Sequence, residues 1–187
     1  MTQKELLDII DECLTGNTGK FRLIVKAYQK MLYALSFRLL CDEEEAKDIC
    51  QETFIKLWEN LKSYNPKYNM STWLYRICSN LCLDRMKKTQ KSVSVETLSV
   101  KIKEISDENS QLKVLENEDV ILLIEGLSSK LTPKQKLVFT LHYFDDLTTA
   151  EISEITGLSA NKIKSNIYLA RKKMIEMINK IENYERR

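Results

Sequence analysis

Apolar residues recur every three to four positions along most of the chain, and this spacing predicts amphipathic helices rather than strands. The chain has only four Gly and two Pro among its 187 residues, which leaves little turn chemistry for a sheet. The pattern therefore predicts an all-α protein. We expect helices over residues 4–14, 20–40, 42–61, 71–88 and 118–129, and further helices beginning at the caps Thr132, Thr148 and Ser159.

The apolar pattern weakens over residues 89–117, where Ser, Thr, Lys and Glu dominate. We therefore expect two small helical domains, residues 1–88 and 118–187, joined by a flexible linker over 89–117. Charge is also distributed in blocks: residues 61–91 carry seven basic side chains and one acidic one, whereas residues 92–128 carry three and eight. Since the C-terminal block is basic again, the chain is predicted to contact a polyanion at two places.

The segment that follows residue 147 has the pattern of a helix-turn-helix. Thr148 and Glu151 form a capping box, Gly157 suits the left-handed conformation that ends a helix, and Ser159 suits the cap of the next helix. The next helix has one apolar stripe, formed by Ile163, Ile167, Ala170, Met174, Ile178 and Ile181.

The rest of that helix carries amide, hydroxyl and basic side chains, which contact base edges and phosphates in DNA. A solvated surface helix would also carry Lys, but no acidic residue occurs between Glu154 and Glu176. We therefore predict that this helix enters the major groove. The predicted contacts are Ser159, Asn161, Lys162, Lys164, Ser165, Tyr168, Arg171 and Lys172.

The predicted helix over residues 42–61 has an acidic face that also carries apolar side chains. Ile55 lies among carboxylates and Trp58 lies at their margin. Such a mixture is typical of a protein-binding face, although a solvated acidic face with one stray apolar residue fits the pattern equally well. The residues assigned to this face are Asp48, Gln51, Glu52, Ile55 and Trp58.

The predicted helix over residues 71–88 has a second, mixed face next to a predicted loop over residues 64–70. Interleaved aromatic and basic groups suit stacking and phosphate contact with unpaired bases. Trp73 fits this interpretation and a place in the core equally well. The assigned residues are Tyr64, Lys67, Tyr68, Trp73, Arg76 and Asn80.

The sequence gives little support for an enzyme, a cofactor or a metal site. The single His142 has no Cys or carboxylate at metal-ligand spacing, and Cys78 with Cys82 supplies at most half of a metal site. The five cysteines suit free thiols in a reducing compartment. Since no signal peptide and no apolar window of about 18 residues occur, we expect a cytoplasmic protein without direct membrane insertion.

Two stretches resemble domains of the sigma-70 family. The runs DEEEAKDICQETFIKLW (42–58) and STWLYRICSNLCLD (71–84) resemble the sigma2 domain. The stretch from LTPKQK (131–136) to Tyr143 and Phe144, followed by residues 147–174, resembles sigma4. Their order, with a short connector and no sigma3 domain between them, resembles the extracytoplasmic-function (ECF) group.

This resemblance implies a sigma factor that binds core RNA polymerase and directs promoter-specific initiation. It implies that the acidic face meets the β′ clamp helices, that a further contact forms with the β flap, and that the 64–70 loop with its neighbouring face engages the melted minus 10 element. The helix-turn-helix would read the minus 35 element, and an anti-sigma factor becomes a candidate partner.

Ser153 stands where the family usually has Ala, and the recognition helix carries Asn166 and Tyr168. These departures leave the minus 35 sequence open.

An alternative fits the residues without the resemblance. The chain would then be a helix-turn-helix regulator whose N-terminal domain binds another protein and never contacts polymerase.

Overall fold

The computed structural model describes the backbone of residues 1–89 and 130–185, and the side chains of residues 1–88 and 130–176. In these ranges the chain forms helices and no strand, which confirms the all-α prediction for the described part. Apart from Thr89, which is helical, the predicted linker over 89–117 and the predicted helix over 118–129 lie outside it. None of the described helices is long and apolar enough to span a bilayer.

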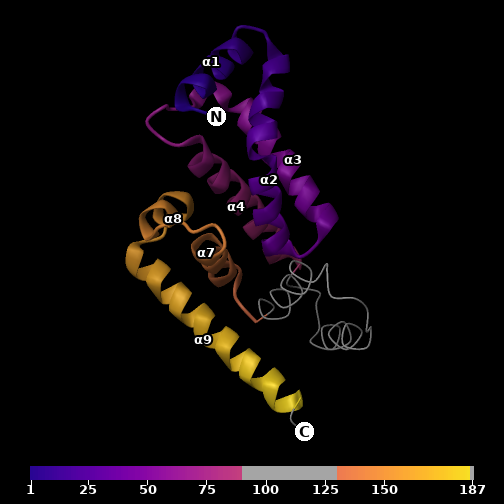
Figure 1. The fold of residues 1–187 in the computed structure, drawn as a ribbon, viewed down its shortest axis with the longest axis vertical. Helices are drawn as coiled ribbons and strands as arrows, with labels where there is room; N and C mark the ends of the chain where they lie inside the picture. The colour runs from indigo at the N-terminus through magenta and orange to yellow at the C-terminus, as the bar shows by residue number, and fades with distance from the viewer. Residues whose placement is uncertain (90–129, 186–187) are drawn as a thin grey trace.

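Four helices form an N-terminal bundle (Figure 1): α1 (Gln3–Leu14), α2 (Phe21–Leu40), α3 (Glu43–Glu59) and α4 (Met70–Thr89). Short 3-10 turns at Thr18–Lys20 and Leu61–Ser63 precede α2 and follow α3. Helices α2, α3 and α4 pack against one another, and α1 packs across α2. The core of the bundle consists of fully buried side chains, among them Ile24, Leu32, Leu35, Ile49, Leu57, Leu74 and Cys78.

Three helices form a C-terminal bundle: α7 (Pro133–Tyr143), α8 (Thr149–Thr156) and α9 (Ala160–Glu185). Both α7 and α8 begin with a capping box, so the predicted starts at Thr132 and Thr148 are confirmed. Gly157 ends α8 with a φ of 69°, in the left-handed region predicted for it. Buried side chains hold the three helices together, namely Leu137, Val138, Leu141, Ile152, Ile155, Ile163 and Ala170.

The two bundles are in contact, because α7 and α8 pack against α4 and α7 also packs against α2. Arg38 Nη1 donates a hydrogen bond to Asp145 Oδ1 at 2.9 Å, and the Arg38 guanidinium lies 5.2 Å from the ring centroid of Phe144. Lys136 Nζ lies 3.3 Å from Cys41 Sγ across the same contact. The C-terminal bundle therefore covers one side of α4.

Helix α4 is covered on more than one side. Leu74 and Cys78 are buried in the core of the N-terminal bundle, and Tyr75 and Ser79 are buried as well. Burial raises the pKa of the Tyr75 hydroxyl, and the neighbouring charge of Asp145 raises it further. Tyr75 thus lies at the contact between the bundles.

Candidate protein and nucleic-acid interfaces

The acidic face of α3 points away from the core and carries two large apolar side chains. Ile55 is 57% exposed and Trp58 is 38% exposed, while Ile49 and Leu57 on the other side of the helix are buried. Asp48 and Gln51 are exposed on the same helix, and Glu52 is half-buried. An isoleucine exposed to this degree lies outside the cores that the described residues form, so the face suits contact with another protein.

Beside this face, α2 and α3 form a shallow groove of about 370 Å³. Val25 and Tyr33 line it from α2, and Cys50, Gln51 and Phe54 line it from α3. Gln51 connects the groove to the exposed face. The contribution of α2 could not be predicted, because the periodicity of one helix does not show which neighbour lies beside it.

The loop before α4, residues 64–69 (the 64–69 loop), and the first turns of α4 enclose a pocket of about 450 Å³. The rings of Tyr64 and Trp73 stack with their centroids 5.7 Å apart and an angle of 16° between their planes. Tyr68, which is 60% exposed, and Arg76 line the same pocket. Trp73 is half-buried in this stack, so its side chain belongs partly to the core and partly to the pocket.

Two residues predicted for this site do not line the pocket. Lys67 is exposed in the 64–69 loop, and Asn80 is exposed further along α4. A residue that sequence reasoning missed does line it: Glu154, from α8 of the other bundle. It places a carboxylate at a pocket whose other lining residues are aromatic, uncharged polar or, in Arg76, basic.

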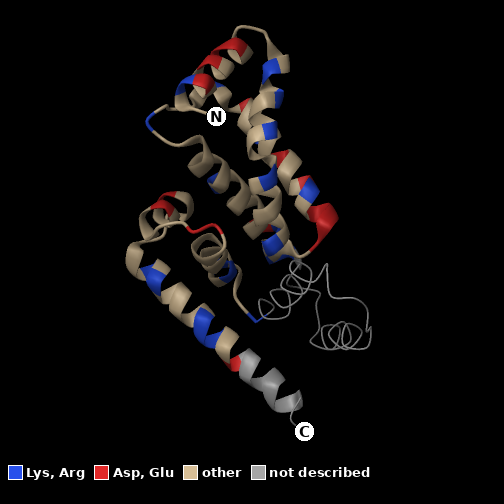
Figure 2. Ribbon diagram, viewed as in Figure 1, with Lys and Arg blue, Asp and Glu red and all other residues tan. Residues whose placement is uncertain are grey.

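The outer face of α9 is open and basic (Figure 2). Tyr168 is 67% exposed, and the apolar residues Ile163 and Ala170 on the inner side are fully buried. All the residues predicted to contact DNA are exposed: Ser159, Asn161, Lys162, Lys164, Ser165, Tyr168, Arg171 and Lys172.

Two polar residues of α9 are engaged within the chain instead. Lys173 Nζ donates to Gln135 Oε1 at 3.1 Å and to the Lys130 carbonyl at 3.2 Å, so it ties α9 to the start of α7. Asn166 Nδ2 donates to the Lys162 carbonyl at 2.7 Å. The side chains of Ile178 and Ile181 lie outside the described residues.

Within the side chains that the structure describes, no three His, Cys, Asp or Glu residues gather as a metal site would require. The five cysteines all lie in this part, and no disulfide joins any two of them. The Sγ of Cys78 lies 3.2 Å from the Ser36 hydroxyl in the core of the N-terminal bundle. His142 Nδ1 lies 3.3 Å from the Leu147 carbonyl, a contact within the C-terminal bundle.

Comparison with known proteins finds two family matches along the chain. Residues 24–92 match the Sigma-70 region 2 family, and residues 121–174 match the family described as Sigma-70, region 4. The ECF RNA polymerase sigma factor SigW of Bacillus subtilis (strain 168) is 32% identical over 174 residues, which cover 87% of this chain and 90% of SigW. The RNA polymerase sigma-H factor of Pseudomonas aeruginosa is 24% identical, over 91% of this chain and 92% of that protein.

Solved structures share the fold. The structure of CnrH in complex with the cytosolic domain of CnrY aligns with a TM-score of 0.65 at 18% identity, over 91% of this chain and 95% of that one. The sigma factor RpoE in complex with the anti-sigma factor NepR from Bartonella quintana aligns with a TM-score of 0.63 at 20% identity, over 85% and 96%. The two family matches and the identity to SigW show that this chain, whose fold the solved structures share, belongs to the extracytoplasmic-function group of the sigma-70 family.

Proposed function

We propose that this sigma factor binds core RNA polymerase through the exposed face of α3 and reads promoters through two separate DNA-contacting faces. The observation that carries the proposal is that both sigma regions occur in one chain, each with an exposed face of suitable chemistry. Promoter-specific initiation follows from joining those faces to the polymerase.

The face of α3 is proposed to meet the β′ clamp helices. Ile55 and Trp58 supply apolar area that a partner would remove from water, and Asp48 and Glu52 supply charge that selects a basic surface. Gln51 lies at the edge of both the face and the α2–α3 groove. The C-terminal bundle is proposed to make the second polymerase contact, with the β flap.

The pocket at the 64–69 loop is proposed to take an unpaired base of the minus 10 element. The stacked rings of Tyr64 and Trp73 and the exposed ring of Tyr68 offer aromatic faces, and Arg76 offers a cation for the phosphate backbone. Lys67 and Asn80 lie outside the pocket and are proposed to contact the melted strand beside it.

The outer face of α9 is proposed to lie in the major groove of the minus 35 element. Lys162, Lys164, Arg171 and Lys172 would neutralise phosphates, and this contribution weakens as salt concentration rises. Ser159, Asn161, Ser165 and Tyr168 reach the same side and are proposed to contact base edges.

Further partners and the compartment belong to the same proposal. The RpoE neighbour was solved with an anti-sigma factor, and we assign this chain a partner of that kind as well. Because we propose that the protein binds core polymerase, we also propose that it acts in the cytoplasm. The relatives are transcription initiation factors, and we propose no catalytic activity or cofactor for this chain.

The decisive experiment combines the purified chain with core polymerase on genomic DNA and sequences the transcripts. We expect start sites that appear only when the chain is present and that share two upstream sequence elements. Start sites identical to those of core enzyme alone, together with DNA binding by the chain, would favour the regulator that does not bind polymerase.

A further inference from the structure

Helix α1 contacts the loop that forms the minus 10 pocket, although α1 precedes residues 24–92 that match region 2. Gln3, in the first turn of α1, donates from Nε2 to the Tyr64 hydroxyl at 3.3 Å and to the Pro66 carbonyl at 3.1 Å. One side-chain amide therefore holds two points of the 64–69 loop.

The first turn of α1 is itself well fixed. The Thr2 hydroxyl accepts from the Glu5 amide at 3.2 Å, and the Glu5 carboxylate accepts from the Thr2 amide at 2.7 Å. Gln3 lies between the two residues of this capping box in the sequence. The inner side of α1 is anchored by Leu6 and Ile10, which are buried in the core of the N-terminal bundle.

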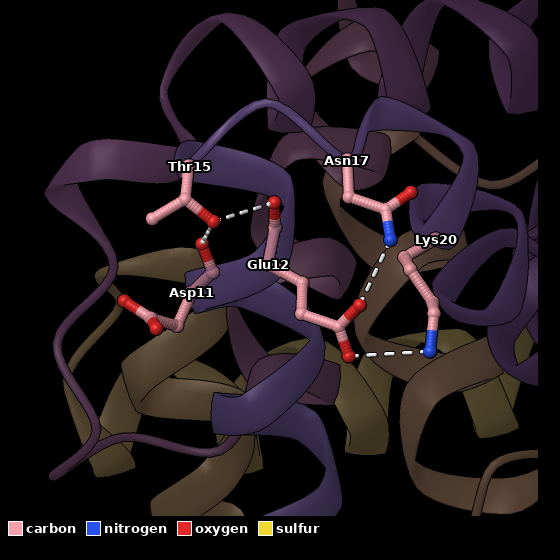
Figure 3. A network of polar contacts seen from close by, with 5 residues as sticks. All are labelled: Asp11, Glu12, Thr15, Asn17 and Lys20. Atoms are coloured by element: carbon pink, nitrogen blue, oxygen red, sulfur yellow. Dashed lines mark hydrogen bonds and ion pairs between the residues drawn. The ribbon is translucent and has the colours of Figure 1, made fainter.

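The far end of α1 is tied to the start of α2 (Figure 3). The Glu12 carboxylate accepts a hydrogen bond from Asn17 Nδ2 at 2.9 Å and lies 3.2 Å from Lys20 Nζ. The Thr15 hydroxyl donates to the Asp11 carbonyl at 2.9 Å. Because α1 is held at both ends and along its length, it can serve as a fixed support for the loop.

The contact with Gln3 continues into the pocket through Tyr64. The Tyr64 hydroxyl accepts from Gln3 and donates to the Tyr68 carbonyl at 2.9 Å, so both of its hydrogen-bonding roles are used. The Tyr64 ring stacks on Trp73. The amide of Gln3 thus fixes the tip of the ring whose face forms the wall of the pocket.

We propose that Gln3 is a positioning residue for minus 10 recognition, acting through Tyr64 to hold the 64–69 loop in the shape that accepts an unpaired base. The inference rests on the proposed function of the pocket and assigns part of its specificity to a helix outside region 2. Gln3 itself needs no contact with DNA in this role.

The test compares Gln3→Glu, which keeps the shape of the side chain but removes its N–H donors, and Tyr64→Phe, which keeps the stacked ring but removes the hydroxyl. Each variant, with core polymerase, transcribes two promoter libraries. One library is randomised over the minus 10 element and the other over the minus 35 element. Asp8→Asn, a change at an exposed residue of the same helix, is the control.

We expect both variants to lower transcription from the preferred minus 10 sequences by at least about two- to tenfold, the range set by one neutral hydrogen bond. Base preference in the minus 10 library should become weaker, while the ranking of minus 35 sequences stays that of the unaltered chain. The control should match the unaltered chain in both libraries.

An unchanged minus 10 preference in both variants would overturn the inference, and so would an equal loss in both libraries, which would mean a general loss of stability. Failure of the proposed function looks different. In that case the unaltered chain itself would select no minus 10 sequence with core polymerase.

Discussion

Arg38 on α2 and Asp145 after α7 form an ion pair that joins the region 2 bundle to the region 4 bundle, with 2.9 Å between Nη1 and Oδ1. The Asp145 side chain is only 8% exposed and that of Arg38 is 27% exposed. Burial raises the pKa of the Asp145 carboxyl, and the Arg38 charge opposes the rise. The carboxylate therefore depends on its partner, because without Arg38 its charge would be buried unpaired.

Reversing one charge of this pair should separate the bundles. Asp145→Arg would place two guanidinium groups together and should destabilise the contact by about 2 kcal/mol, the range for a hydrogen bond between charged groups. Small-angle X-ray scattering should then show a larger radius of gyration. Adding Arg38→Asp restores opposite charges and should restore the smaller value. If the single variant scatters like the unaltered chain, the ion pair does not hold the contact.

Ile55, the more exposed of the two apolar residues on the α3 face, should contribute strongly to polymerase binding. Ile55→Asp combined with Gln51→Ala should weaken binding to core polymerase by at least about tenfold, because it removes apolar area from the centre of the proposed interface. Fluorescence anisotropy of the labelled chain titrated with core enzyme measures the change. Leu14→Asp, at a residue 43% exposed on α1, tests for a general effect of a new surface charge. Equal affinity of the double variant and the unaltered chain would exclude this face.

Two residues of the recognition helix should have different effects on DNA binding. Lys164→Ala should reduce affinity about equally for all sequences and should lower its salt dependence, because a phosphate contact is lost. Asn161→Ala should instead change which minus 35 sequence is preferred, with a loss of about 1–3 kcal/mol on the preferred one. Binding assays with a set of duplexes at two salt concentrations separate these outcomes. A uniform loss from Asn161→Ala would refute its role in reading bases.

The capping box of α8 should make the helix-turn-helix sensitive to acid. Hydrogen bonds from the Thr148 side chain, and then from its backbone amide, lower the pKa of Glu151. A lowered carboxyl pKa stabilises the fold above the unfolded value of about 4.3, and this contribution is lost as pH falls through the folded value. Glu151→Ala should therefore destabilise the domain by roughly 0.5–1 kcal/mol at pH 7.

Thermal unfolding followed by circular dichroism measures this effect. The difference between Glu151→Ala and the unaltered chain should shrink as pH falls below about 4. Glu154→Ala removes the same charge from the same helix without touching the cap, and serves as the control. A difference that stays constant down to acid pH would show that the ionised capping contact is not its source.

Local signals in the sequence predicted the helix boundaries well, because each depends on neighbours in the chain. The caps Thr132 and Thr148 and the left-handed Gly157 all act within a few residues, and all three are confirmed. By contrast, α2 is capped at its C-terminus by Cys41 with a φ of 57°. This left-handed conformation is uncommon for a cysteine, so the sequence does not predict it.

Features that depend on distant segments could not be predicted. The burial of Tyr75 follows from the packing of α7 and α8, which lie more than 50 residues further along the chain. The place of Glu154 in the pocket at the 64–69 loop and the hydrogen bonds of Gln3 arise in the same way. The residue types of the candidate sites were predictable from periodicity, while the neighbours that complete those sites were not.

The packing of α8 on α4 holds the two bundles close together. This contact limits how far apart on DNA the two proposed DNA-contacting faces can bind. On the proposed function, the two faces contact elements centred near positions minus 10 and minus 35, about 25 base pairs apart, or roughly 85 Å of B-form DNA at 3.4 Å per base pair. Helix α4 borders the proposed minus 10 pocket, and α8 lies in contact with it and directly before α9. While the two bundles stay in contact, their two proposed DNA-contacting faces cannot occupy sites so far apart. On the proposed function, we therefore expect the chain to exchange the contact between its bundles for contacts with polymerase and DNA, and we expect the free energy of that contact to form part of the free energy required to occupy a promoter.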